Sequence, residues 1–373
     1  MKESVILYIG GFEMPDKNAA AHRVLSNAKI FRDIGKKVVF IGIDKSLAWG
    51  TNVLKTHTYI QGFEAYSVPY PSGGMSWIKY LTKIQDYIKV CEKLGNVEMV
   101  ILYNFQAIAM KKLMIYCKRN KIKCCADITE WRSTRGETFA YRILKDSDTW
   151  YRMHVLHKKL DGLIVISRFL ENYYKKCKNV VYLPVLVDCS EDKWNHKNDK
   201  STDVLKLVYA GNPGRKDRID KLIDALDKVE RKYLLDIIGI TSKQYLKYYP
   251  QHIGILRRHE NIIFHGRLSH CDTLNYIKKA NYSCFFREND RVSKAGFPTK
   301  FVEAITCGTP VITNTTSDLI EYITNNCNGK LLKSFDQDSI CNLFENVPSL
   351  MQTNSTMFDY HAYIEKVQIF CEW

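Results

Sequence analysis

The sequence of 373 residues lacks the features that mark several protein classes. It has no apolar run close to the roughly 20 residues that a membrane-spanning helix needs. Its twelve cysteines include no CxxC pair and are scattered through apolar segments, which argues against a zinc site and favours a reducing compartment. There is no internal repeat and no low-complexity tract, and the composition is that of a soluble globular protein. We therefore expect a cytoplasmic protein that holds no metal.

The positive charge is concentrated in the first half of the chain. Residues 1–190 carry 30 Lys and Arg against 17 Asp and Glu, whereas residues 191–373 carry 25 against 23. The first half should therefore attract anions over a long range. Candidate partners are an anionic membrane surface, a lipid-linked phosphate or an acidic polysaccharide; Lys-rich helices that simply face water are the alternative. No nucleic-acid-binding motif accompanies the charge, so we do not expect nucleic acid as a partner.

Short apolar runs alternate with helical patterns along the chain, which is typical of a parallel sheet with helices on both faces. Strands are expected at 5–9, 38–43, 65–68, 99–103, 121–126, 163–166, 180–183, 205–210, 233–238, 262–265, 282–286 and 311–313. Helices are expected at 20–34, 77–94, 107–119, 149–160, 168–177, 218–229, 241–249, 271–279 and 299–307.

A highly polar stretch at 188–204 reads as a linker between two such patterns. The sequence thus predicts an α/β protein with two doubly wound, Rossmann-like domains that face each other across a cleft. The domains would cover residues 1–190 and 204–350, and an amphipathic helix at about 355–373 would pack back on the first domain.

The segment Lys294–Thr313 (KAGFPTKFVEAITCGTPVIT) is the most informative part of the chain. Its pattern predicts a loop, a short helix that opens at Pro298 and ends at Gly308, and then a strand. A helix start directs free backbone N–H groups and a positive dipole end at what precedes it, which suits phosphate oxygens. The Glu303 carboxylate could accept hydrogen bonds from adjacent sugar hydroxyls. The segment fits a nucleotide-sugar; an ordinary helix-to-strand crossover is the alternative.

Two glycines, Gly10 and Gly11, follow the first expected strand. Glycines at a strand's carboxyl end let the backbone approach a ligand closely, although the spacing is not GxGxxG and a plain tight turn is the alternative. His22 and Arg23 open the next helix, where they could meet an anion.

A similar loop, Gly211-Asn-Pro-Gly-Arg-Lys-Asp217, follows the strand at 205–210. Its adjacent cations Arg215 and Lys216 could neutralise a diphosphate leaving group. No Walker A sequence is present, and solvated cations on a surface turn are the alternative.

Two acidic motifs lie in the first half. Asp127 and Glu130 follow an expected strand, where a carboxylate could bind or deprotonate an acceptor hydroxyl and Trp131 could stack on a sugar; Asp127 as a helix cap or loop residue is the alternative. Asp146-Ser-Asp148 matches a DxD metal motif, but helical patterns flank it, so we interpret it as helix capping.

Taken in order, these segments resemble the retaining glycosyltransferases of the GT-B fold, in particular family 4, the glycosyl transferases group 1. The likeness runs from residue 5 to about 330 and is carried by Gly10-Gly11, 163–167, 183–188, Gly211–Lys216, Gly266–His270 and Gly296–Pro310. It implies a nucleotide-sugar in the C-terminal domain, an acceptor in the N-terminal domain, and no cofactor.

The resemblance also implies roles for single residues, with Glu303 on the nucleotide ribose and Lys216 on the diphosphate. The implied donor-binding set is Gly11, Gly211, Gly296, Phe297, Pro298, Thr299, Lys300 and Glu303; the catalytic set is Lys216, Arg215, Asp127 and Glu130; the acceptor-side set is His22, Arg23 and Trp131.

The chain departs from the family pattern at two positions. The family's paired glutamates are separated by seven residues, and the position that precedes Glu303 by this spacing is Ala295, so the usual contact to the donor sugar is missing. Some relatives with a Gly-Phe-Pro-Thr-Lys form share this loss. The family's Arg after the first C-domain glycine is Asn212, and Arg215 would take its place.

The family mechanism implies retention of configuration without a protein nucleophile or a metal, because the departing diphosphate helps to deprotonate the acceptor. We therefore expect a hexosyl-type glycosyltransferase that uses a UDP- or GDP-linked donor and extends a lipid-linked or cell-surface polysaccharide. Its basic N-terminal half would hold it peripherally on an anionic membrane. A catalytically silent partner protein, suggested by Ala295, and a nucleotide-sugar 2-epimerase are the alternatives.

Overall fold

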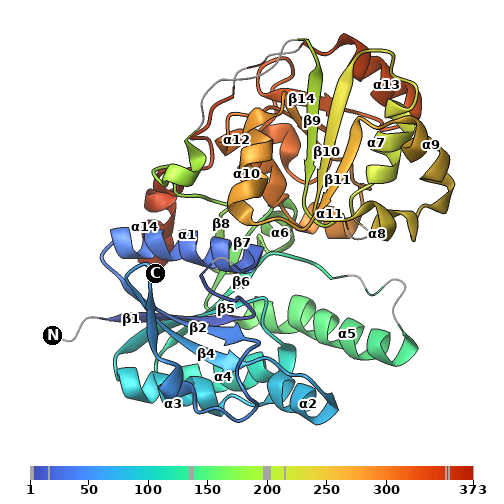
Figure 1. The fold of residues 1–373 in the computed structure, drawn as a ribbon. Coiled ribbons are helices and arrows are strands. Elements are labelled where there is room, and N and C mark those ends of the chain that lie inside the picture. Colours follow the sequence, from blue (N-terminus) through green and yellow to red (C-terminus); the bar gives the residue numbers. More distant parts are fainter. Residues whose placement is uncertain are drawn as a thin grey trace. The chain divides into compact units, whose positions relative to one another are not determined.

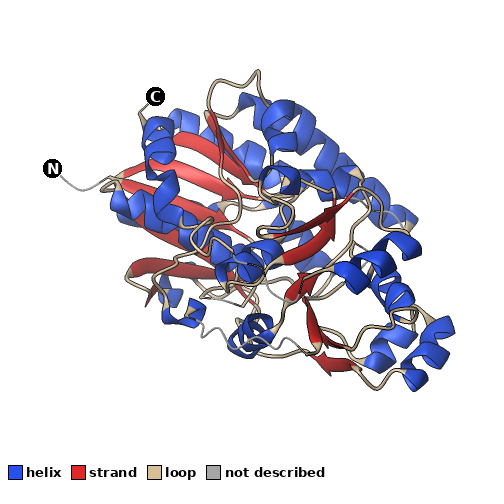
Figure 2. Cartoon of the chain, turned by 90° about the horizontal axis from the view of Figure 1, so that it is seen from above, coloured by secondary structure: helices blue, strands red, loops and turns tan. Residues whose placement is uncertain are grey.

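A computed structural model describes residues 4–15, 17–132, 134, 138–195, 203–213, 216–348, 351 and 353–372. The chain divides into two compact units (Figure 1). Unit 1 comprises Met1–Val187 and Asp359–Trp373, and unit 2 comprises Asp188–Phe358. Each unit is built on its own sheet, and Figure 2 shows the strands with helices packed against them.

The described part of unit 1 contains an eight-stranded sheet in the order β3-β4-β2-β1-β5-β6-β7-β8. The strands are β1 Val5–Gly10, β2 Lys37–Asp44, β3 Thr58–Ile60, β4 Phe63–Pro69, β5 Val97–Tyr103, β6 Lys123–Ile128, β7 Gly162–Val165 and β8 Val180–Tyr182. All pairs are parallel except β3 with β4. Every residue of β1 is buried, as expected for a parallel strand that is covered on both faces.

The main helices of unit 1 are α1 Ala19–Asp33, α2 Gly74–Thr82, α3 Gln85–Leu94, α4 Ala107–Arg119, α5 Phe139–Tyr151, α6 Arg168–Tyr173 and α14 Ile364–Cys371. The crossover from β1 to β2 runs in the opposite direction across the sheet from those that carry α2, α3 and α4. Right-handed crossovers therefore place α1 on one face and α2, α3 and α4 on the other, and Figure 1 shows α1 and α4 on opposite sides.

The last residues of the chain return to unit 1 and lie beside α1. The Tyr360 backbone N–H donates to the Val187 carbonyl at 3.0 Å, and the Asn179 side chain donates to the Phe370 carbonyl at 3.0 Å. Tyr363, Val367 and Phe370 join the buried apolar cluster on this face of the sheet. Unit 1 is thus assembled from two separate stretches of sequence.

The described part of unit 2 contains a six-stranded sheet in the order β11-β10-β9-β12-β13-β14, and all of its pairs are parallel. Its strands are β9 Leu205–Ala210, β10 Tyr233–Ile238, β11 Ile262–Gly266, β12 Tyr282–Cys284, β13 Val311–Asn314 and β14 Gly329–Leu332. Its helices are α7 Ile219–Leu226, α8 Ser242–Leu246, α9 Ile253–Arg258, α10 His270–Lys279, α11 Arg291–Ala295, α12 Thr299–Thr306 and α13 Gln337–Asn346.

The structure differs from the sequence prediction where one helix was expected over 77–94. The chain forms α2 and α3 instead, because Lys83 is extended and Ile84 turns into the core. The carbonyl of Thr82, left without a partner in the helix, accepts a hydrogen bond from Lys112 Nζ at 2.7 Å. A partner from another helix therefore compensates for the break.

The expected helix over 149–160 also lies elsewhere. The α-helix is α5, which covers Phe139–Tyr151, and the chain continues through one π-helical turn and one 3-10 turn to Lys159. In the part of the chain that the structure describes, no helix has both the length and the apolar content to cross a bilayer.

Candidate functional site

The candidate site of unit 2 lies at the carboxyl ends of β9 and β12. These strands are neighbours and run in parallel, so the residues that follow them meet at one edge of the sheet. Gly211 follows β9 directly, and Arg287 follows β12 by three residues. A two-residue bridge between Asp217 and Arg287 ties the two loops together. Lys300, in the first turn of α12, reaches the same place.

Asp217 is the centre of a buried polar cluster, which we call the Asp217 cluster (Tyr209, Asp217, Arg287 and Lys300). One carboxylate oxygen accepts from Arg287 Nε at 2.6 Å, and the other accepts from the Tyr209 hydroxyl at 2.7 Å and from Lys300 Nζ. The ammonium of Lys300 also lies 4.0 Å from the centroid of the Tyr209 ring. The lysine is therefore held from two directions.

Two cations share one carboxylate in this cluster, which leaves a surplus positive charge in a poorly hydrated place. Burial alone would raise the pKa of Asp217, but Lys300 and Arg287 lower it to about 2. Burial lowers the pKa of Lys300 to about 8, against the opposing attraction of Asp217. A bound anion would balance the surplus charge, so the cluster is suited to phosphate.

The loop that leads into the cluster depends on two glycines with positive φ. Gly211 has φ +125, and a Cβ there would come within 3.5 Å of Lys300 Nζ. Gly239, at the end of β10, has φ +107, and a Cβ there would lie 2.3 Å from the Gly211 carbonyl oxygen. Only glycine allows the backbones that follow β9 and β10 to pass this closely.

We expect Gly239→Ala to lower the free energy of unfolding by about 1–3 kcal/mol, because the new methyl group meets the Gly211 carbonyl at a backbone angle that alanine disfavours. Urea denaturation measures the loss. Gly254→Ala is the matched control. Gly254 lies in α9 with negative φ and has room for a Cβ, so this change should be neutral or stabilising by up to about 1 kcal/mol. Equal unfolding midpoints for the two variants would contradict the prediction.

Glu303 lies one helical turn after Lys300 on α12, so the two side chains are neighbours. One of its carboxylate oxygens lies 3.1 Å from His270 Nε2, at the start of α10. The carboxylate is partly exposed, unlike that of Asp217. Ligand hydroxyls could therefore reach Glu303, whereas Asp217 is confined to its cluster.

The turn before α12 is held by aromatic packing. Phe297 is buried, and its ring contacts those of Phe301, Tyr322 and Phe358. Phe297 therefore positions the turn and does not face a ligand. Pro298 occupies the N-cap position and is buried, whereas Gly296 and Thr299 are half-buried.

Three further residues from the sequence analysis belong to unit 2. They are the predicted cations Lys216 and Arg215, and Ala295, at which the chain departs from the family pattern. Lys216 is exposed, and its backbone N–H donates to the Pro213 carbonyl at 3.3 Å. Arg215 lies outside the described residues. Ala295, at the family position of the first glutamate, is fully buried at the end of α11.

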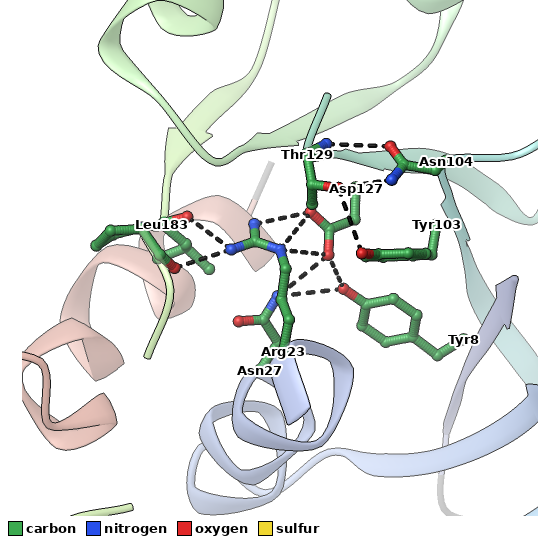
Figure 3. A network of polar contacts seen from close by, with 9 residues as sticks. Tyr8, Arg23, Asn27, Tyr103, Asn104, Asp127, Thr129 and Leu183 are labelled. Atoms are coloured by element: carbon green, nitrogen blue, oxygen red, sulfur yellow. Dashed lines mark hydrogen bonds and ion pairs between the residues drawn. The ribbon is translucent and has the colours of Figure 1, made fainter. Parts of the chain in front are cut away.

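Unit 1 contains a buried ion pair in which Arg23 binds Asp127 (Figure 3). Both side chains are almost completely buried. Arg23 donates to both oxygens of Asp127 at 2.8 to 3.0 Å and to the carbonyls of Leu183 and Pro184. Tyr8 donates its hydroxyl to Asp127 at 2.6 Å, and burial, with the charge of Asp127 next, raises the Tyr8 pKa so that it stays a donor.

This geometry changes the expected roles of Arg23 and Asp127. Asp127 lies within β6 and not after it, and its oxygens face Arg23, Tyr8 and Asn27. Neither residue presents its charge to solvent, so neither fits a role in contacting an acceptor or its phosphate. The anion that Arg23 meets is the Asp127 carboxylate, and the pair joins α1, β6 and the end of β8.

The other residues predicted for unit 1 are not gathered into one cluster. Trp131 is buried among His154, Phe169 and Tyr173, so it offers no open face to a sugar. Glu130 pairs with Arg132 at 2.6 Å and remains partly exposed. His22 is half-buried in the first turn of α1.

Gly11 is exposed after β1, and a Cβ there would lie 3.9 Å from the Tyr80 hydroxyl. Tyr80 belongs to a pocket of about 500 Å³ at the carboxyl ends of β2 and β4. Its lining includes Trp49, Lys79, Lys83 and Tyr87. Aromatic rings and lysines together suit a ligand that combines sugar rings with negative charge.

The two aspartates of the DxD motif are inside α5 and not at its start. Asp148 Oδ1 accepts from the Ala107 backbone N–H at 2.8 Å, which caps the first turn of α4. Asp146 accepts from the Thr134 hydroxyl at 2.8 Å. Asp148 therefore caps a helix other than its own.

Sequence reasoning did not single out Tyr209, Arg287 or His270 as site residues, and it named Asp217 only as the end of a loop. The available signal was positional, since Tyr209 and Arg287 flank the carboxyl ends of two strands. Asp217 binds both of them and also binds Lys300, which lies 83 residues later in the chain. These contacts follow from the strand order, which local patterns do not reveal.

Residues 190–355, nearly all of unit 2, match the family model of glycosyl transferases group 1. Among curated proteins, no sequence gives a match.

Solved structures agree with the fold over almost the whole chain at low sequence identity. A sucrose-phosphate synthase from Thermosynechococcus elongatus superposes with a TM-score of 0.72 at 13% identity, covering 98% of both chains. HepE from Anabaena, in complex with UDP-glucose, has a TM-score of 0.65 at 13% identity and the same coverage. WaaG, a glycosyltransferase involved in lipopolysaccharide biosynthesis, has a TM-score of 0.62 at 14% identity, covering 99% of this chain and 100% of the other. The chain has the GT-B fold.

Proposed function

We propose that the protein is a retaining glycosyltransferase that moves a hexosyl group from a UDP- or GDP-linked donor to a lipid-linked or cell-surface polysaccharide acceptor. The observation that carries the proposal is the Asp217 cluster with its surplus positive charge, one turn from Glu303 on α12. Support comes from the group 1 family match over unit 2 and from the UDP-glucose complex of HepE.

In this proposal unit 2 binds the donor. The diphosphate lies at the start of α12, where Lys300, Arg287 and the free backbone N–H groups of the first turn neutralise it. Exposed Lys216 adds a further cation from the Gly211 loop. Glu303 accepts hydrogen bonds from the two ribose hydroxyls, and His270 orients its carboxylate.

The transfer then breaks the bond between the anomeric carbon and the diphosphate oxygen and forms a bond to the acceptor oxygen on the same face. The acceptor proton passes to the departing diphosphate, so no protein base is required. The residues of unit 2 contribute by stabilising the negative charge that develops on the leaving group.

Unit 1 holds the acceptor in this proposal. The pocket lined by Trp49, Tyr80 and Lys83 suits an anionic glycan because rings can stack on its aromatics and charges can pair with its lysines. WaaG, with the same fold, is involved in lipopolysaccharide biosynthesis. A lipid-linked acceptor also agrees with the basic first half and with a peripheral place on a membrane.

The proposal is tested by thermal unfolding of the full-length protein with UDP-, GDP- and ADP-sugars, together with an assay of slow sugar release. A nucleotide at 100 times its Kd should contribute about 2.7 kcal/mol of stability. We expect Glu303→Gln to weaken binding about 10- to 100-fold, because the neutral amide replaces charge-assisted hydrogen bonds to the ribose.

Glu260→Gln is the matched control for Glu303→Gln. Glu260 is exposed just before β11, at the opposite edge of the sheet, so its amide variant should bind as the wild type does. If no nucleotide or nucleotide-sugar shifts the unfolding temperature, the proposal fails. Binding without sugar release or transfer would favour a silent nucleotide-binding protein, which the buried Ala295 also suggests.

A further inference from the structure

Three helices of unit 1 (α2, α4 and α5) lie next to one another, with α4 in the middle. Lys112 on α4 donates to the carbonyl of Thr82 at the end of α2 at 2.7 Å. At its other end, α4 begins with an N–H bonded to Asp148 of α5 at 2.8 Å. The three helices therefore form a continuous layer. We call their solvent-facing side the α2–α4–α5 face.

The three helices carry an unusual number of exposed apolar side chains. They are Met75 and Ile78 on α2, Ile108 and Ile115 on α4, and Phe139, Tyr141, Ile143, Leu144 and Trp150 on α5. Nine of the sixteen large apolar side chains that are exposed in the described structure are thus found on three helices. Large exposed apolar patches mark surfaces that bind a protein, a membrane or a ligand.

Three of the exposed apolar side chains of α5 form a stripe that could enter an apolar phase. Phe139, Ile143 and Trp150 are spaced by four and seven residues, so they share one side of the helix. Phe139 is 76% exposed and Trp150 is 59% exposed. They do not pack on the core of unit 1, so their exposure costs free energy in water unless another surface covers them.

The charges on these helices are almost all positive. The sequence places seven cations on them: Lys79, Lys111, Lys112, Lys118, Arg119, Arg142 and Lys145. The only acidic residues of the three helices are Asp146 and Asp148. Both are engaged, since Asp146 accepts from Thr134 and Asp148 caps α4. The surface is therefore apolar and cationic together.

We propose that the α2–α4–α5 face docks this protein on an anionic lipid bilayer. Trp150 combines an apolar ring system with a polar N–H group, which suits the boundary between headgroups and acyl chains. The lysine and arginine side chains can extend their charges to lipid phosphates while their stems cover apolar surface. A second copy of this chain is disfavoured as the occupant, because it would bring the same positive charges face to face.

Docking would bring unit 1 to a lipid-linked acceptor, and only this role of the docking face rests on the proposed function. Docking itself needs no donor. A thermal shift with UDP reports on unit 2 alone, so failure of docking and failure of the proposed function give separate results.

The test is co-sedimentation of the full-length protein with vesicles of phosphatidylcholine containing phosphatidylglycerol, compared with vesicles of phosphatidylcholine alone. We expect binding to the anionic vesicles at low salt and a large loss at high salt. Lys111→Gln with Arg142→Gln removes two exposed cations and should weaken binding roughly 30-fold.

The apolar part of the face is tested with the triple variant Phe139→Ser, Ile143→Ser and Trp150→Ser, which should lose vesicle binding. The matched control is Tyr248→Ser, Ile320→Ser and Ile369→Ser, which changes three exposed apolar residues elsewhere and should bind like the wild type. Thermal unfolding of each variant checks that it is folded.

Three results would overturn the proposal. The first is an absence of wild-type binding to anionic vesicles. The second is equal binding to neutral and anionic vesicles. The third is undiminished binding by the folded triple variant on α5. If that variant instead breaks a dimer of the wild type, which light scattering would detect, the face is an interface between copies and the bilayer is excluded as its occupant.

Discussion

Asp127→Ala should lower the free energy of unfolding by about 3–5 kcal/mol, the largest stability loss that we expect from a single substitution in unit 1. The variant leaves the guanidinium of Arg23 buried with only the carbonyls of Leu183 and Pro184 as described partners. The hydroxyl of Tyr8 loses its acceptor at the same time. Urea denaturation followed by circular dichroism measures the loss.

A matched aspartate control separates this effect from the removal of any carboxylate. Asp86 pairs with Lys89 at 3.5 Å on the surface of α3, so Asp86→Ala should cost about 0–1 kcal/mol. Replacing both Arg23 and Asp127 by leucine removes both charges and should cost less than Asp127→Ala alone. A loss below about 1 kcal/mol for Asp127→Ala would show that the buried pair contributes little.

Lys300→Met should weaken the binding of UDP about 10- to 100-fold, because it removes one charge-assisted contact to the diphosphate. The fold should persist, since Asp217 keeps Arg287 and Tyr209 as partners and the two remaining charges balance. Calorimetric titration measures the affinity. Lys243→Met is the control, because Lys243 lies on α8, outside the Asp217 cluster.

The same variant has a pH signature in stability, which follows from the burial of Lys300 and does not depend on a ligand. The Lys300 pKa is lowered to about 8 from 10.5, so between these values the folded protein has lost a proton that the unfolded chain retains. The stability of the free wild type should therefore rise with pH over this interval relative to Lys300→Met, by at most about 1.4 kcal/mol per pH unit.

Binding should follow the opposite trend. Above pH 8 the neutral amine no longer attracts phosphate, so the UDP affinity of the wild type should fall as the pH rises, and that of Lys300→Met should not. Parallel pH profiles for the two proteins would indicate that Lys300 does not contact the ligand.

The succession of strands and helices along this chain follows from patterns that are visible in its sequence, but the partners within its polar clusters do not. The buried run Val5–Ile9 predicts β1, and the pattern at Lys294–Thr313 predicts α12 and β13 closely, because apolar periodicity and helix-ending glycines are local signals. The break at Lys83 depends on Lys112, 29 residues later, and is not a local property.

The candidate sites show the same difference between what local sequence signals predict and what contacts between distant residues decide. Glu303 was expected from its place near the start of a helix, which is a local signal, and Lys300 was named through the family resemblance. The sequence predicted that Asp127 lies near the carboxyl edge of the sheet and binds an acceptor. Its pairing with Arg23 inside the core was not predicted, because Arg23 lies 104 residues earlier and nothing near Asp127 in the sequence indicates the contact. Buried pairing is decided by tertiary packing.

The return of residues 359–372 to unit 1 has a consequence for the order of events during synthesis. A ribosome releases the strands β1 to β8 first, yet α14 and its contacts to Val187 and Asn179 arrive only after all of unit 2 has been made. At about 5–20 residues per second, the nascent first unit waits roughly 10–35 seconds for its last helix. During that interval, the apolar side chains that α14 later covers on α1 are open to chaperones.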